Sequence, residues 1–147
     1  MSNLLAKAEA VEAIFHETHE SAISIPRAML LSVIEGDEGV AITLASEHSD
    51  VYDLLDSEDT TQVAKVSDCI AVVTSGWASP IDGSESDVAP SAHPKRRRVR
   101  LLVMASREGM ASILRFEDDP ENPILDDGEA KGTLADALHS VMVRANA

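Results

Sequence analysis

The stretch KRRRVRLLVMASREGMASILRFEDD, residues 95–119, decides the fold of this chain. Its first half alternates so that two sets of side chains point to opposite faces of a strand, and the second set changes from basic to apolar along the chain. Ser106-Arg107-Glu108-Gly109 supplies a polar turn in which Gly109 can adopt a positive φ, and residues 110–116 return as the partner strand. The pattern predicts a β-hairpin whose first strand is central in a sheet. The two sets are Val99, Leu101, Val103, Ala105 and Arg98, Arg100, Leu102, Met104.

A second apolar run, residues 69–74, predicts another central strand because it is apolar on both faces. Gly76 and Trp77 are expected to end this strand. The residues expected in the core of these strands are Ile70, Val72, Leu102, Val103 and Leu114.

The composition restricts the class of partner. The formal net charge is -14, which repels nucleic-acid phosphates and anionic membrane surfaces alike. The chain has four aromatic residues, too few and too scattered for a base-stacking platform: Phe15, Tyr52, Trp77 and Phe116. We therefore expect neither a nucleic acid nor a membrane as partner.

The lone cysteine, Cys69, excludes an intramolecular disulfide framework and fits a reducing compartment as a small core residue. No apolar run approaches the roughly 18 residues of a membrane span, and the first residues are not typical of a signal peptide. The sequence predicts a cytoplasmic protein.

The remaining segments complete one domain over residues 1–147. An apolar stripe with Leu5 and Ile14 at its margins predicts a helix over 3–20, and Glu9, Glu12, His16 and Glu20 are expected on its solvent side. The other predicted elements are strands at 27–34 and 40–45, a short helix within 46–65 capped by Ser49 or Asp50, irregular loops at 79–94 and 118–131, and a final helix from Thr133.

The resulting order is α-β-β-α-β-β-β-α, which predicts an α+β fold. Five strands joined mainly by short turns imply an antiparallel sheet with the N- and C-terminal helices packed on it. This order resembles the profilin-like and roadblock-like scaffolds, and the resemblance implies a role in protein recognition without identifying any residue.

Three short segments resemble small actinobacterial and actinophage proteins to which no activity is assigned. That resemblance spans about residues 70–140 and implies a shared fold. The segments are Ser75-Gly76-Trp77-Ala78, residues 93–100 and Arg115-Phe116-Glu117-Asp118.

No motif predicts a catalytic residue, a metal site or a cofactor. His16 and His19 are spaced i, i+3, whereas the H-E-x-x-H zinc motif needs i, i+4, so a solvated helix end is the favoured interpretation. The acidic run over 117–129 lacks the alternating spacing of a calcium loop and contains prolines. Neither a nucleophile elbow nor a glycine-rich phosphate loop is present.

The most unusual local feature is a basic cluster in an acidic chain, residues 95–100, which holds five of the twelve Lys and Arg residues. Alternation places Arg96, Arg98 and Arg100 on one face, where they are expected to pair with a neighbouring strand or with the acidic 117–129 stretch, or else to dock an acidic partner. The candidate partner-binding residues are Trp77, His93, Arg96, Arg98 and Arg100.

The leading hypothesis is a non-catalytic protein-interaction or regulatory module that binds a protein partner and forms a homo-oligomer. One alternative is a small-ligand binder or enzyme with a site around residues 77–98, and another is an acidic DNA mimic. If the basic cluster joins subunits, reversing Arg96 and Arg98 to Glu should weaken self-association or loosen the acidic stretch, and high salt should do the same.

Overall fold

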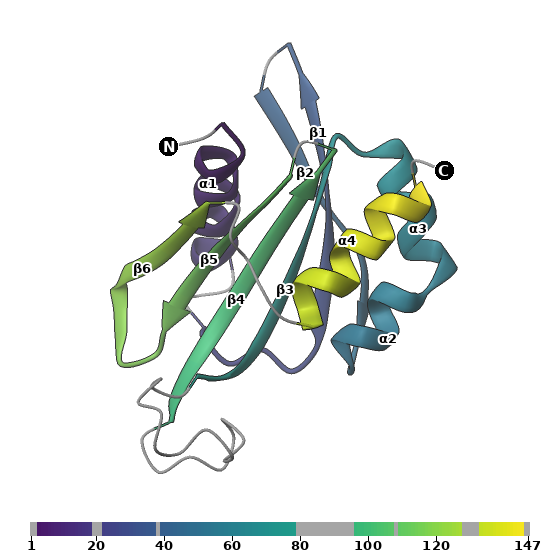
Figure 1. The fold of residues 1–147 in the computed structure, drawn as a ribbon. Coiled ribbons are helices and arrows are strands. Elements are labelled where there is room, and N and C mark those ends of the chain that lie inside the picture. The colour runs from purple at the N-terminus through teal and green to yellow at the C-terminus, as the bar shows by residue number, and fades with distance from the viewer. Residues whose placement is uncertain are drawn as a thin grey trace.

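The computed structural model describes residues 3–18, 22–37, 39–78, 96–107, 109–127 and 133–145. They form a six-stranded antiparallel sheet in the order β2-β1-β3-β4-β5-β6, with helices on both faces (Figure 1). The elements are α1 Asn3–Thr18, β1 Ala28–Gly36, β2 Gly39–His48, α2 Val51–Asp56, α3 Glu58–Val66, β3 Cys69–Ala78, β4 Arg97–Ser106, β5 Gly109–Phe116, β6 Asp119–Asp127 and α4 Thr133–Ala145.

The predicted hairpin at the centre of the fold is confirmed. β4 pairs with β5 from Ser106 opposite Gly109 to Val99 opposite Phe116, and Gly109 has a φ of 153°, which an L side chain rarely adopts. β3 flanks β4 on the other side, so both apolar strands lie inside the sheet. Of the five residues expected in the core, Ile70, Val72, Leu102 and Val103 are buried and Leu114 is half-buried.

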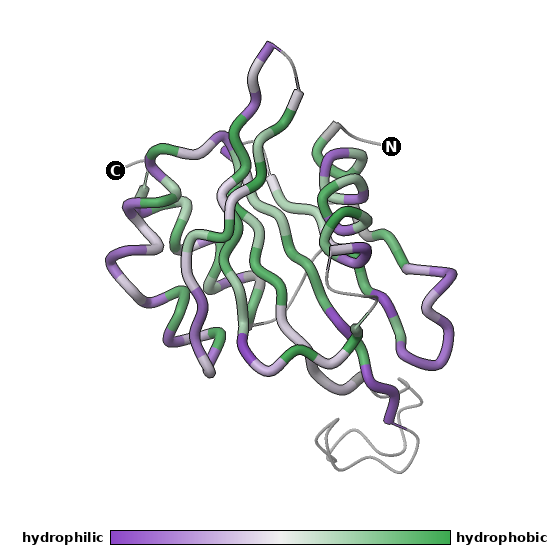
Figure 2. The backbone as a smooth tube through the Cα atoms, turned by 180° about the vertical axis from the view of Figure 1, so that it is seen from behind, coloured by the Kyte–Doolittle hydropathy of each residue, from purple (hydrophilic) through white to green (hydrophobic). Residues whose placement is uncertain are grey.

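The two faces of the sheet carry separate apolar clusters. α1 packs over β4, β5 and β6, whereas α2, α3 and α4 pack on the opposite face against β1, β3 and β4, as the two opposite views show (Figures 1 and 2). Alternate residues of β4 enter alternate clusters, because Leu102 and Met104 join α1 while Val103 and Ala105 join α4. The sheet is therefore the middle of three layers.

The predicted α+β class is confirmed, but the predicted five strands are wrong. Residues 119–127, expected to be an irregular loop, form the edge strand β6 beside β5. Pro120 and Pro123 are tolerated there because an edge strand pairs along one side only, and the register shifts opposite Arg115. A proline-containing acidic segment with a loop-like composition thus forms an edge strand.

Two further boundaries differ from the prediction. β3 continues through Gly76 and Trp77 to Ala78, because the long β4 strand offers pairing partners for all of them. The single short helix expected within 46–65 is two helices that meet at Ser57. Asp50 is the N-cap of the first, as predicted, and its carboxylate accepts hydrogen bonds from the backbone N–H groups of residues 52 and 53.

The first helix ends at Thr18 within the described residues, and its solvent side was assigned wrongly at two positions. Ile14, expected at the margin of the buried stripe, is exposed. Glu12, expected in solvent, is buried against the sheet. Within the described residues, no helix combines the length and the apolar character that crossing a membrane requires.

Candidate functional site

Trp77 and two arginines meet where the β3 and β4 strands extend beyond the helices. The register places Trp77 directly opposite Arg98. The guanidinium carbons of Arg96 and Arg98 lie 4.9 and 5.0 Å from the centroid of the Trp77 ring, which is cation–π distance. These residues line a surface pocket of about 620 Å³ together with Ser24, Arg97, Glu117 and Asp118. We call this the Trp77 pocket.

Arg97 closes one side of the Trp77 pocket through an ion pair with Asp118. Its Nη2 and Nε donate to the Asp118 carboxylate at 2.6 and 2.9 Å, and its guanidinium lies 4.0 Å from the centroid of Phe116. The hydrogen bond from Arg97 lowers the pKa of Asp118. Within the described residues, the acidic stretch therefore binds the basic cluster through the ion pair of Arg97 with Asp118.

A hydrogen bond to the segment that follows α1 orients the Arg98 side chain. Its Nε donates to Ser24 Oγ at 2.9 Å. Ser75 of β3 fixes that segment to the sheet, because its hydroxyl donates to the carbonyl of Ile23 at 2.7 Å and accepts the N–H of Ile25 at 2.8 Å. The segment that contributes Ser24 to the pocket is thus held by side chains fifty or more residues away in the chain.

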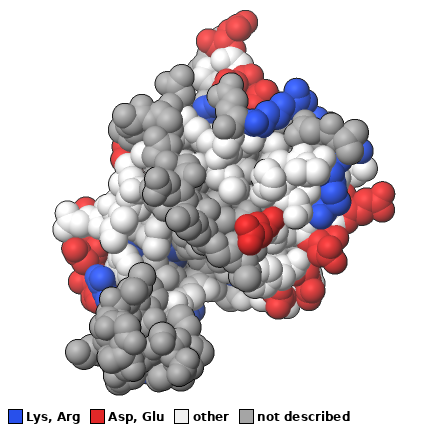
Figure 3. Space-filling view, in the orientation of Figure 1, with Lys and Arg blue, Asp and Glu red and all other residues white. Residues whose placement is uncertain are grey.

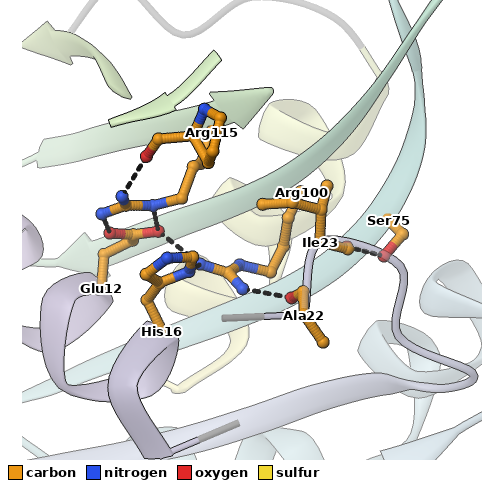
Figure 4. Close-up of polar contacts among 8 residues, drawn as sticks. Glu12, His16, Ala22, Ile23, Ser75, Arg100 and Arg115 are labelled. Atoms are coloured by element: carbon orange, nitrogen blue, oxygen red, sulfur yellow. Dashed lines mark hydrogen bonds and ion pairs between the residues drawn. The ribbon is translucent and has the colours of Figure 1, made fainter. Parts of the chain in front are cut away.

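Arg100, the fifth predicted partner-binding residue, is not at the surface. Its side chain is 1% exposed, and its Nη2 donates to Glu12 Oε2 at 2.8 Å (Figure 4). Arg115, directly opposite on β5, donates to both oxygens of the same carboxylate at 2.6 and 2.9 Å. Arg100, predicted to contact a partner, is buried within this chain, because helix α1 covers that part of the strand and supplies the carboxylate itself.

Glu12, Arg100 and Arg115, which we call the buried ion group, differ in the direction in which their pKa values shift. Burial acts to raise the pKa of Glu12, but hydrogen bonds and charges from Arg115 and Arg100 outweigh it and lower that pKa. Burial lowers the pKa of Arg100, whereas the hydrogen bond to Glu12 raises the pKa of the more exposed Arg115. Both arginines remain protonated, so the buried Arg100 and the partly buried Arg115 share one carboxylate.

His16 completes the buried ion group one helical turn after Glu12. Its Nδ1 lies 2.7 Å from Arg100 Nη2, and since a guanidinium can only donate, the imidazole accepts. Burial and the charges of Arg115 and Arg100 lower the pKa of His16. Arg100 Nη1 also donates to the carbonyl of Ala22, while Arg100 Nε has no hydrogen-bond partner in the described part of the chain. His16 is therefore partly buried and supports the fold, and His19 lies outside the described residues.

The structure brings together three of the five predicted partner-binding residues: Trp77, Arg96 and Arg98. His93 and the loop at 79–94 lie outside the described residues, as does Lys95. Within the described ranges, no group of three or more His, Cys, Asp or Glu side chains could hold a metal ion.

Comparisons with protein-family models, curated proteins and solved structures find no match for this chain. Both resemblances drawn from the sequence therefore stay predictions.

Sequence reasoning missed Glu12 and Arg115, although two signals for them exist. Glu12 lies one residue after Val11 and four after Ala8, which places a carboxylate within the apolar stripe of α1. The hairpin register places Arg100 opposite Arg115, a like-charge pair that is destabilising unless an acid lies between them. Together these two signals predict a buried Arg–Glu–Arg group.

Proposed function

We propose that this protein is a non-catalytic, cytoplasmic interaction module that binds an acidic segment of a partner protein in the Trp77 pocket. One observation carries the proposal: two guanidinium groups lie on an exposed tryptophan ring in a chain of net charge -14. Arg and Trp are the residues most enriched among those that dominate binding energy in protein interfaces.

The charges around the pocket support a ligand with carboxylates. Among the described residues that line it, three are arginines and two are acidic, so the charge of this described lining is opposite in sign to that of the whole chain. A ligand carboxylate can accept from a guanidinium while that guanidinium stays on the ring, since the ring uses its face and the carboxylate uses its N–H groups. A compartment that keeps the buried Cys69 reduced fits the proposed cytoplasmic location.

The two alternative functions, a small-ligand site and a DNA mimic, have less support from the structure. A small anionic ligand would fit the pocket by size, because ligand sites are commonly about 300–1,000 Å³. However, the pocket is an open surface feature, and its charged lining residues are exposed except for the half-buried Arg98. A DNA mimic would need rows of carboxylates, and on the face in Figure 3 the acidic side chains lie in separate groups.

Trp77 itself provides the measurement, because it is the only tryptophan in the chain. We expect blocked octaglutamate to change the Trp77 fluorescence with a saturable curve, and octaglutamine of equal length to leave it unchanged. Raising the salt concentration should weaken the binding. Equal responses to the two peptides would overturn the proposal, and citrate binding as tightly as octaglutamate would favour the small-ligand alternative.

Matched variants identify the residues responsible. Reversing Arg96 and Arg98 to Glu should weaken octaglutamate binding at least about tenfold, equivalent to about 1.4 kcal/mol. Arg107→Glu is the control, since Arg107 is an exposed arginine at the β4–β5 turn, outside the lining of the Trp77 pocket. Because Arg107→Glu changes the net charge by half as much as the double reversal, a loss of half as much binding free energy in Arg107→Glu would mean that only net charge matters and that no site exists there.

A further inference from the structure

The two edges of the sheet differ in how they are protected against pairing with another chain. β6 carries two prolines and acidic residues at both ends, in the sequence DPENPILDD, and both devices block the addition of a strand. β2 is the other edge, and its residues 40–46, VAITLAS, contain no charge and no proline. The outer edge of β2 pairs with no strand in the described part of the chain.

The apolar side chains of β2 gather on one face of the sheet. Val40, Ile42 and Leu44 lie opposite Glu35, Val33 and Leu31 of β1, so they share the face on which α1 packs. Ile42 packs against the cluster beneath α1, whereas Val40 is 47% and Leu44 51% exposed. α1 packs over β4, β5 and β6 and so leaves this end of the cluster uncovered.

We propose that β2 pairs antiparallel with β2 of a second copy of this chain, so that the two sheets form one continuous sheet across a twofold axis. A second copy fits for an electrostatic reason. Two chains of net charge -14 repel at long range, and an uncharged edge is where their backbones can approach without opposing like charges. Pairing also joins the two α1-side clusters through Val40 and Leu44.

The geometry limits the assembly to a dimer. The β1–β2 register is regular from Gly39 to Leu44 and then shifts, which leaves Ala45 without a partner. The regular stretch of each copy would contribute to about six inter-strand hydrogen bonds, within the range of about 5–15 found in specific interfaces. Twofold pairing uses both β2 edges, and the proline-containing β6 edges then prevent further growth.

The response of the dimer to salt distinguishes this interface from one built on the basic cluster. An uncharged interface gains from screening of the overall repulsion, so 1 M salt should leave the dimer unchanged or tighten it. An interface through Arg96 and Arg98 would weaken instead. The acidic-peptide site and the dimer are therefore independent, and the Arg96→Glu, Arg98→Glu protein should lose peptide binding while it remains dimeric.

Sedimentation over a range of concentrations tests the proposal. We expect a monomer–dimer equilibrium for the native chain, and at least a tenfold weaker dimer for Leu44→Lys, which places a charge on the β2 edge. Ile124→Lys is the matched control, because Ile124 on β6 is 52% exposed and should leave the dimer unchanged. A native chain that stays monomeric up to about 1 mM, or equal losses from both variants, would overturn the proposal.

A second measurement keeps the test decisive if Leu44→Lys fails to fold. In the native chain, amide hydrogen exchange at residues 39–44 should become slower as the protein concentration is raised. The same change should not occur at residues 119–127. Concentration-independent exchange at 39–44 would also overturn the proposal.

Discussion

Arg98 and Arg100 lie on the same face of β4, two residues apart, but one is at the surface and the other is buried. Arg98 rests on Trp77 at the surface and donates to Ser24, whereas Arg100 is buried against Glu12. The difference arises from α1, which covers the strand at Arg100 and supplies a carboxylate there. The same residue type is therefore buried in the fold at position 100 and lies at the surface at position 98.

The largest expected effect comes from removing the charge of Glu12. Glu12→Gln leaves the buried Arg100 without its counter-ion and removes the carboxylate that the partly buried Arg115 shares with it, which should lower the free energy of unfolding by about 3–5 kcal/mol. Glu9→Gln is the control, since Glu9 is exposed on the same helix. Urea unfolding of both variants measures the effect, and a loss below about 1 kcal/mol for Glu12→Gln would show that the buried ion group is not structurally important.

Arg100→Met should cost less than Glu12→Gln, because Arg115 can still neutralise Glu12. The change removes the hydrogen bonds to the Glu12 carboxylate and to the Ala22 carbonyl. Bonds to charged groups contribute about 1.5–3 kcal/mol, so a loss of that size in the free energy of unfolding is expected. A loss larger than that of Glu12→Gln would contradict the assignment of Glu12 as the shared counter-ion.

Lowering the pH should reduce the free energy of unfolding in two steps. Each loss should be smaller than the losses expected for Glu12→Gln and Arg100→Met. The lowered pKa of His16 means that the unfolded chain takes up a proton first, so the free energy of unfolding should fall as pH drops below about 6.5. The lowered pKa of Glu12 adds a second fall below about 4.5. His16→Gln should remove the first step only, and an unchanged slope between pH 6.5 and 5 would exclude His16 as its source.

How far the sequence predicts this structure depends on whether local pattern or distant contact decides each element. The β4–β5 hairpin was predicted because strict alternation and Gly109 are local signals. β6 was missed because its pairing with β5 overrides the loop-like composition of Asp119–Asp127.

For the candidate site, the sequence predicted that Trp77 and Arg98 lie together but not that Arg100 is buried. Trp77 and Arg98 were selected because they flank one loop, and strand pairing does bring them together. The burial of Arg100 depends on Glu12, which is 88 residues away in the chain. Such a contact follows from the packing of α1 on the sheet, so no pattern local to residues 95–100 could indicate it.

Arg98→Met should have the smallest effect on stability and tests the comparison directly. Methionine keeps an apolar side chain beside Trp77 but removes the guanidinium and its hydrogen bond to Ser24. Because exposed polar contacts contribute about 0–1 kcal/mol, the free energy of unfolding should fall by less than about 1 kcal/mol, well below the loss for Arg100→Met. Octaglutamate binding, followed by Trp77 fluorescence, should nevertheless weaken several-fold in Arg98→Met. If Arg98→Met destabilises the protein as much as Arg100→Met and leaves peptide binding intact, then both arginines serve the fold and the Trp77 pocket is not the binding site.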